Sequence, residues 1–228
     1  NGNTSHYASG KYVYNDGDGS TGYDREFTMM LTEVWAEAHW AFSHTQLPEW
    51  SDYTPDFFLL NGRVYPDTIA PNGSMDFRNP VYDANGDAIP IPGHEHLVSQ
   101  PLSSLVTCNA GERVLLRFAN LGYVKQTMAL SGIKMKIVGK DATHLRGRNG
   151  TDYSYDTIGV SMEPGESFDA IFEAPAYQPE AKGYNTYLLY NRNYTSLNKF
   201  DSSGFGGQMT EVHVYPSGTL GAQAIPNT

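Results

Sequence analysis

The sequence predicts an all-β fold with long loops, and three observations lead to this prediction. The 228 residues include 16 Tyr and 10 Phe, which favour strands, and 23 Gly with 13 Pro, which favour turns. Only 18% of the residues are charged, which is too few for the surface of an ordinary helical bundle. Short runs with apolar residues at alternate positions recur along the chain, as in a sandwich of antiparallel sheets.

We expect about nine strands, most of them with apolar residues at alternate positions. The predicted strands cover residues 26–32, 57–60, 113–119, 126–131, 134–139, 157–162, 167–172, 184–190 and 211–215. Ser131-Gly132 separates the fourth strand from the fifth, so these two are expected to form a hairpin. Gly-Glu precedes both 113–119 and 167–172, which indicates either two similar halves or two ordinary turns.

Helix signals are few and loops are long. Residues 32–42 (TEVWAEAHWAF) could form two helical turns, or could continue the preceding strand into a loop. Loops are expected at 1–22, 70–101 and 193–207, and loops of this length are usually functional or form an interface.

Charge and composition exclude several function classes. Fifteen Lys and Arg against 25 Asp and Glu give a formal net charge of −10, which disfavours binding to nucleic acid. No uninterrupted apolar run of about 18 residues is present, so no membrane-spanning helix is expected. The first residues contain no apolar signal-peptide core, so a signal peptide, if there was one, has been removed.

Two motifs resemble binding loops but fail the tests for them. Residues 17–22 match GxGxxG, yet a strand rather than a helix follows and Asp16 and Asp18 would repel phosphate, so an acidic turn is expected. Residues 83–87 place oxygen ligands at alternate positions, as calcium loops do, but Ala88 and His94 stand where such a loop needs Gly and Glu. A hairpin turn explains these residues without calcium.

His94-Glu95-His96 is the best candidate for a metal site. In an extended segment residues i and i+2 point to the same side, so both imidazoles could face one ion. Zinc and copper sites use three or four protein ligands, however, and the other five of the seven histidines are isolated in sequence. We therefore expect His94 and His96 to be exposed loop histidines without a metal.

The one cysteine excludes an internal disulfide and a site built from paired thiols. Cys108 is followed by a turn, and the next histidine is His144, so we expect a small buried or half-buried thiol. Ser161 lies in an alternating strand pattern rather than in a nucleophile elbow.

Four segments together resemble the multicopper oxidase family, in the family's own order. They are DFFLLNGRVYP (56–66), CNAGERVLLRFAN (108–120), KMKIVGKDA (134–142) and VSMEPGESFDA (160–170). Ala142 stands where the family usually has Gly. The set is most similar to the middle domain of three-domain, laccase-type enzymes, and it covers about residues 23–215.

The resemblance implies a Greek-key, cupredoxin-like β-sandwich at 23–215, between a leading segment or linker at 1–22 and a C-terminal linker at 216–228. A blue copper in this family needs a Cys with a His shortly after it, and the trinuclear centre needs four His-x-His pairs. This chain has one such pair, placed where the family has no copper ligands, and Cys108 has no His shortly after it. We therefore expect no catalytic, cofactor-binding or metal-ligating residue here.

The resemblance further implies an exported enzyme that couples one-electron substrate oxidation to reduction of oxygen to water. Copper would belong to the parent enzyme, and flanking cupredoxin domains would be the partners of this chain. By itself the chain is expected to be inactive. Its role would be to hold the copper-bearing domains apart and to line part of the substrate cleft with its loops. The alternative is a secreted interaction or carbohydrate-binding sandwich, which Trp35, Trp40 and Trp50 suggest because aromatic faces stack on sugars. A self-contained electron-carrier cupredoxin is excluded, because it would need a His shortly after Cys108 to complete its copper site.

Overall fold

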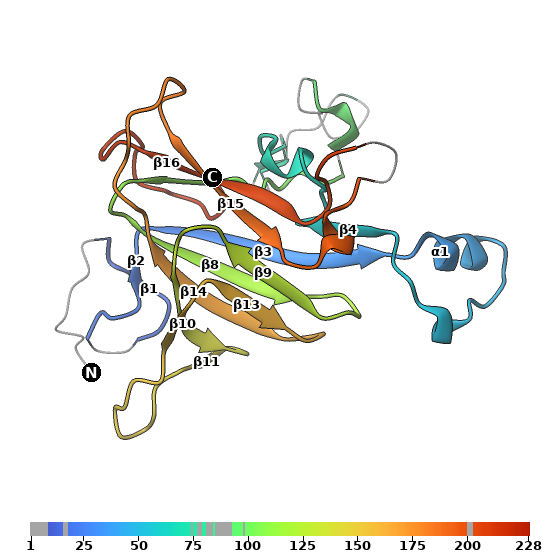
Figure 1. Cartoon of the computed structure of the whole chain (residues 1–228), viewed down its shortest axis with the longest axis horizontal. Coiled ribbons are helices and arrows are strands. Elements are labelled where there is room, and N and C mark those ends of the chain that lie inside the picture. Colours follow the sequence, from blue (N-terminus) through green and yellow to red (C-terminus); the bar gives the residue numbers. More distant parts are fainter. Residues whose placement is uncertain are drawn as a thin grey trace.

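Two β-sheets pack face to face around one hydrophobic core in the computed structural model of the chain (Figure 1). The structure describes residues 9–15, 18–73, 75–76, 79–80, 84, 93–97, 99–199 and 203–228. The predicted all-β sandwich is therefore confirmed.

The larger sheet has seven strands, in the order β11–β10–β14–β8–β3–β4, with β12 also paired to β10. Its strands are β3 (Arg25–Val34), β4 (Phe57–Leu60), β8 (Arg113–Asn120), β10 (Met135–Lys140), β11 (Thr143–His144), β12 (Tyr155–Thr157) and β14 (Ser167–Glu173). The pair β3–β8 is parallel, whereas β8–β14 and β10–β14 are antiparallel.

The smaller sheet has five strands, in the order β13–β9–β15–β16–β7. Its strands are β7 (Val106–Asn109), β9 (Gln126–Leu130), β13 (Gly159–Met162), β15 (Asn185–Asn191) and β16 (Met209–Tyr215). The pair β7–β16 is parallel and the others are antiparallel. From β8 to β15 the main strands alternate between the two sheets along the chain, so the connections cross the sandwich.

The remaining elements are short and lie at the rims of the sandwich. They are β1 (Lys11–Tyr12), β2 (Gly22–Tyr23), β5 (Met75–Asp76), β6 (Asn79–Pro80), α1 (Ala36–Ser43), and the 3-10 turns η1 (Trp50–Asp52), η2 (Asp67–Ile69), η3 (Glu95–Leu97) and η4 (Tyr194–Leu197). The helix α1 and the loop after it project beyond the end of β3 (Figure 1). Within the described residues no helix has the length and apolar character needed to cross a bilayer.

Alternating side chains build the core, as the sequence predicts. Phe27, Met29 and Leu31 of β3 are fully buried between the sheets, and Val212 and Val214 of β16 meet them from the opposite side. Such burial stabilises the fold by about 25 cal/mol for each Å² of apolar surface removed from water. The ambiguous segment 32–42 divides between two elements, because β3 ends at Val34 and α1 starts at Ala36.

The predicted hairpin between 126–131 and 134–139 is wrong. β9 pairs with β13 and β15 in the smaller sheet, whereas β10 pairs with β11, β12 and β14 in the larger one. Ser131-Gly132 is therefore a crossover between sheets, with Gly132 at φ +75°. Alternation marks both strands but carries no information about their partners, which is why the sequence misleads here.

The edge of β3 that β4 leaves open is covered by side-chain amides. The amide of Gln223 pairs with both the N–H and the carbonyl of Glu26, at 2.7 and 3.1 Å. Asn227 does the same for Thr28, at 2.9 and 3.1 Å, and Asn61 accepts from Met30 at 2.8 Å. These carboxamides imitate a neighbouring strand. The segment 216–228, expected as a linker, is therefore anchored on the sheet.

Candidate functional site

A cleft of about 1060 Å³ opens at the rim where the two sheets meet. One wall comes from β4 and the residues that flank it, and the other from the loop between β15 and β16. Its lining residues are Thr54, Pro55, Asp56, Phe57, Phe58, Val64, Tyr65, Pro66, Val124, Asn193, Thr195, Ser196, Asn198, Lys199, Gly206 and Gly207. The backbone N–H of Tyr65 donates to the carbonyl of Gly207 at 2.9 Å, so the two walls are directly linked.

A chain of polar side chains leads away from this cleft. The hydroxyl of Tyr65 donates to Glu211 at 3.1 Å, and the other Glu211 oxygen lies 2.7 Å from Nε2 of His213. The His213 ring stacks on Tyr184, with ring centroids 4.0 Å apart. Burial raises the pKa of Tyr65, and the hydrogen bond to the Glu211 carboxylate raises it further. Burial and Glu211 thus extend to higher pH the range over which the Tyr65 hydroxyl keeps its proton.

Cys108 does not fit a copper centre. It is fully buried on β7, and its Sγ lies 3.9 Å from the backbone oxygen of His213. Burial raises the pKa of its thiol to about 12, so the group stays neutral at pH 7. A blue copper requires a thiolate and two imidazoles around one point. Among the described residues Cys108 is not part of any group of three metal-ligating side chains.

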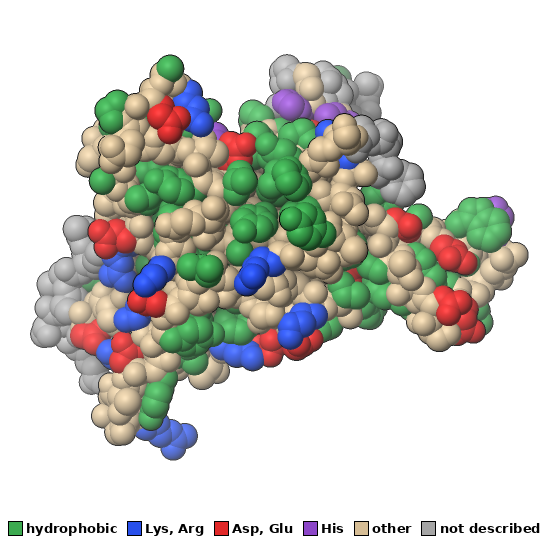
Figure 2. Space-filling model, in the orientation of Figure 1, with side chains coloured by type: hydrophobic (Ala, Val, Ile, Leu, Met, Phe, Trp, Pro, Cys, Tyr) green, Lys and Arg blue, Asp and Glu red, His purple; other side chains and the backbone are tan. Residues whose placement is uncertain are grey.

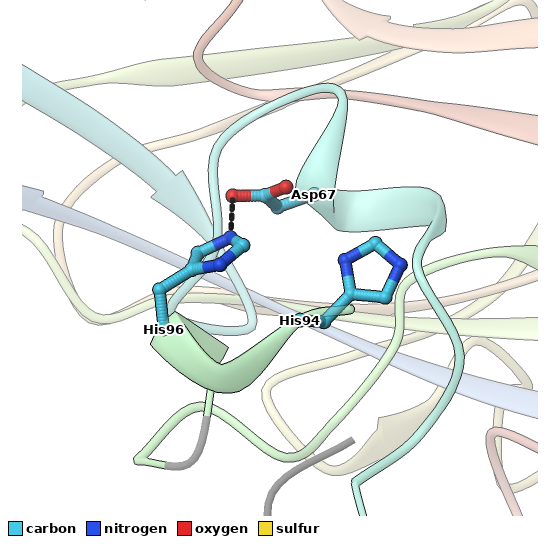
Figure 3. Close-up of side chains that lie close together, drawn as sticks. All are labelled: Asp67, His94 and His96. Atoms are coloured by element: carbon cyan, nitrogen blue, oxygen red, sulfur yellow. Dashed lines mark hydrogen bonds and ion pairs between the residues drawn. The ribbon is translucent and has the colours of Figure 1, made fainter. Parts of the chain in front are cut away.

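Asp67, His94 and His96 form the one group of this kind in the described part of the chain. His94 lies directly before η3, His96 lies within it, and Asp67 begins η2. One ligand atom from each residue lies within 4.8 Å of the other two. Figure 3 shows the His96 ring bonded to the Asp67 carboxylate, with a ring nitrogen of His94 facing the pair.

Sequence reasoning found the two histidines and missed Asp67. Residues 67 and 96 are 29 positions apart, and no spacing rule connects them. In Figure 2 histidine side chains, drawn in purple, lie at the upper right of the molecule, above a surface of mostly hydrophobic side chains. The expectation of exposed loop histidines agrees with His96, whose side chain is 57% accessible, and is wrong for His94, which is half-buried. The Asp67 side chain is 29% accessible.

Arg63 fixes the turn that carries Asp67. Its side chain is buried and its guanidinium donates to four backbone carbonyls, at 2.7 to 3.2 Å, which belong to Asp67, Ala70, Pro71 and Gln100. Burial lowers the pKa of Arg63 and the nearby Asp67 opposes that change. The planar guanidinium can donate to all four carbonyls at once, whereas a lysine ammonium in its place could not.

The three tryptophans lie at the projecting end of the molecule. Trp35 is buried, whereas Trp40 and Trp50 are 56% and 51% exposed. Trp50 contacts the rings of Trp35, Phe42, Tyr53 and Tyr123, with centroids 5.7 to 6.5 Å apart. We call Trp35, Phe42, Trp50, Tyr53 and Tyr123 the aromatic cluster.

The other motifs behave as follows. Within 17–22, Asp18 accepts from the N–H of Ser20 at 2.9 Å and pairs with Arg146, and the strand β2 follows, so the predicted acidic turn is confirmed for its described part. The rejected calcium motif at 83–87 lies outside the described residues, apart from Ala84. Ser161 lies on β13 and contacts Thr127 at 2.9 Å, which confirms the strand.

Comparisons with known proteins place the chain in a family. The family model for multicopper oxidase matches residues 25–201. A search of curated proteins found no match. Among solved structures, a blue copper oxidase from Nitrosomonas europaea aligns at a TM-score of 0.56 with 15% identity, over 84% of this chain and 44% of that one.

A second solved structure, the multicopper oxidase mgLAC, aligns at a TM-score of 0.55 with 16% identity, over 88% of this chain and 46% of that one. The chain therefore spans less than half the length of either protein. At these identities the alignments establish a shared fold, which confirms the cupredoxin-like Greek-key sandwich. Because the family model covers more than half of its residues, the chain belongs to the multicopper oxidase family.

Proposed function

We propose that this chain is a cupredoxin-like domain of a longer multicopper oxidase. The domain itself would hold no electron-transfer copper; it would hold the copper-bearing domains in place and line part of the substrate cleft. The longer enzyme would couple one-electron oxidation of a substrate to reduction of oxygen to water, with its coppers held by other, flanking cupredoxin domains. We propose that this enzyme is exported. The observation that carries the proposal is the position of Cys108.

The geometry around Cys108 supports a domain without blue copper. In the parallel pair β7–β16, Cys108 lies opposite Val214 and Thr107 lies opposite His213. Side chains alternate between the faces of a sheet, so the thiol points into the core and the imidazole points outward. Among the described residues, the core-facing thiol therefore lacks the neighbouring imidazoles that a blue-copper ligand set needs.

The cleft supports the second part of the proposal, a role in lining a substrate site. Phe57, Phe58 and Tyr65 give it an aromatic wall, and Lys199 adds a cation on the opposite wall. A mostly apolar cleft with a few polar groups is the usual form of a site for a small organic molecule. In the longer enzyme this domain would close one side of such a site.

The segments outside 23–215 would connect the domain to its neighbours. Residues 216–228 run from β16 to the edge of β3, where Gln223 and Asn227 are anchored. We propose that this anchorage fixes where the connection to a following domain starts, and that residues 1–22 lead into the sandwich.

Oxygen consumption tests the proposal. The copper-loaded chain is mixed with a one-electron donor, and its oxygen uptake is compared with that of the same concentration of free copper and of the copper-loaded Cys108→Ala variant. All three rates are expected to agree. Copper-dependent turnover by the wild-type chain that is lost in Cys108→Ala would overturn the proposal.

Carbohydrate binding is the second candidate, and the half-exposed rings of Trp40 and Trp50 favour it. A glycan array probed with the wild-type chain and with Trp40→Ala and Trp50→Ala decides between the candidates. Binding to a defined glycan that both variants lose supports carbohydrate recognition. An array without binding removes this candidate.

A further inference from the structure

We propose that Asp67, His94 and His96 bind one first-row divalent cation, and that Zn²⁺ suits the site. The proposal does not depend on the proposed function, because this group lies on loops and shares no residue with the Cys108 environment. It departs from the sequence prediction that His94 and His96 bind no metal, which considered the two histidines without the carboxylate.

The donor set points to this class of metal. Two imidazoles and one carboxylate form a set that zinc and neighbouring first-row metals prefer, whereas calcium and magnesium select oxygen donors. Three protein ligands also leave a fourth tetrahedral position for water or another small molecule. The His96 side chain, 57% accessible, gives solvent a path to that position.

The state of His94 supplies the second, independent observation. Its Nδ1 is buried and has no hydrogen-bond partner in the described residues. Leaving a buried polar atom unpaired is destabilising, so such atoms usually have a partner. The His94 and His96 rings lie with their centroids 6.0 Å apart. A cation between His94 and the His96–Asp67 pair would accept the nitrogen lone pair that nothing else uses.

The His96–Asp67 contact alone does not account for this arrangement. Nε2 of His96 lies 2.9 Å from the Asp67 carboxylate, and an exposed pair of this kind contributes little to stability. The contact leaves His94 without a role. With a metal present, the same carboxylate and ring nitrogen become ligands and His94 completes the set.

The fold holds one side of the site in place. Arg63 fixes the turn η2 through its bonds to the carbonyls of Asp67 and Ala70, so the position of the carboxylate is set before any metal binds. Tyr65 and Pro66, directly before Asp67, line the cleft. A bound cation would therefore fasten the segment 93–97 to the wall of the cleft.

Zinc titration tests the site. The chain, stripped with a chelator and gel-filtered, is titrated with Zn²⁺ in a calorimeter, alongside Asp67→Asn, His94→Gln, His96→Gln and the control His39→Gln, which changes an exposed histidine on α1. We expect one Zn²⁺ per wild-type and His39→Gln chain. Each of the three site variants should bind at least about 100-fold more weakly.

The metal-free melting temperature of each variant shows whether it is folded. His96→Gln is the decisive variant, because its side chain is the most exposed of the three and its loss removes little packing. Zn²⁺ should raise the melting temperature of the wild-type chain and of His39→Gln, and leave that of folded His96→Gln unchanged. The proposal is overturned if the wild-type chain binds no zinc, or if folded His96→Gln binds it as tightly as His39→Gln.

Discussion

Cys108 and His213 belong to neighbouring, paired strands, and their side chains lie on opposite faces of the smaller sheet. The register of β7 and β16 places Cys108 beside Val214, one position away from His213. The thiol is fully buried in the core, while the imidazole bonds to Glu211 and stacks on Tyr184. Because of this register, the neighbouring strand β16 places no imidazole beside the chain's one thiol.

The raised pKa of Cys108 predicts a pH dependence of stability. The thiol ionises at about 9 in the unfolded chain and at about 12 in the folded one, so its contribution to stability is complete below pH 9. Between pH 9 and 12 the unfolded state releases the proton first, and the free energy of unfolding falls by about 1.4 kcal/mol for each pH unit.

Urea unfolding of the wild type and Cys108→Ala across pH 7–12 measures this contribution. Cys108→Ala is expected to lose stability less steeply above pH 9, because it lacks the thiol. Tyrosine ionisation acts on both proteins equally, so the difference between the two curves reports the thiol. Parallel curves for the two proteins would show that the thiol ionises normally.

Burial raises the pKa of Tyr65, and Glu211 is predicted to raise it further. Glu211→Gln removes the carboxylate charge, so the pKa of Tyr65 should fall towards its ordinary value of 10.0 while remaining above it because of burial. Absorbance titration of the tyrosines, with Tyr65→Phe used to assign the signal, measures the change. A Tyr65 transition that Glu211→Gln leaves in place would contradict the hydrogen bond.

A buried group of amides joins the two sheets, and Asn191 is its centre. The Asn191 amide donates to Gln126 at 2.5 Å and to Gln208 at 2.7 Å. Gln208 in turn donates to the carbonyls of Thr32 and Leu59, on strands of the larger sheet. Asn191→Leu leaves two buried acceptors without this donor and should lower the free energy of unfolding by about 3 kcal/mol.

Chemical denaturation measures this loss, with Asn149→Leu at an exposed loop position as the matched control. The control should stay within about 0.5 kcal/mol of the wild type. Equal stabilities for the two variants would show that the amide group does not hold the sheets together.

Asn227 is predicted to protect the edge of β3. Its φ of +60° lies in the left-handed region, so Asn227→Gly removes the side chain without adding backbone strain. The Thr28 N–H then loses its acceptor and the Thr28 carbonyl loses a donor, so the free energy of unfolding should fall by about 2 kcal/mol. Hydrogen exchange at the Thr28 amide should accelerate, while the Leu116 amide, inside the β3–β8–β14 ladder, keeps its protection relative to global unfolding.

Unchanged exchange at Thr28 would show that the C-terminal segment does not cover this edge. Such a result would restore the simple linker that the lack of periodicity in 216–228 predicts.

Periodicity predicted the strands that face the core and failed where pairing matters. The pattern of residues 113–119 matches β8 almost to the residue, because Val114, Leu116 and Phe118 all point inward. β7 was missed although β4 is equally short, because its sequence VTCN is less apolar than the FFLL of β4. The partners of β9 and β10 depend on contacts across the whole sandwich, which alternation does not encode.

The candidate metal site was likewise predictable only in part from the sequence. The His-x-His pattern marked two donors, because short spacing is visible in a sequence. Asp67 joins them only because Arg63 fixes the turn η2 while the segment 93–97 folds back against it. A contact between two loops, 29 residues apart, leaves no local pattern to detect.

Absorption spectroscopy of the copper-saturated, dialysed chain tests the central claim most directly. The account predicts no intense blue, thiolate-to-copper band, and identical spectra for the wild type and Cys108→Ala. Any copper that is retained should be pale and should be lost in His96→Gln, which separates the loop site from the core thiol. A stoichiometric blue band that disappears in Cys108→Ala would contradict the account.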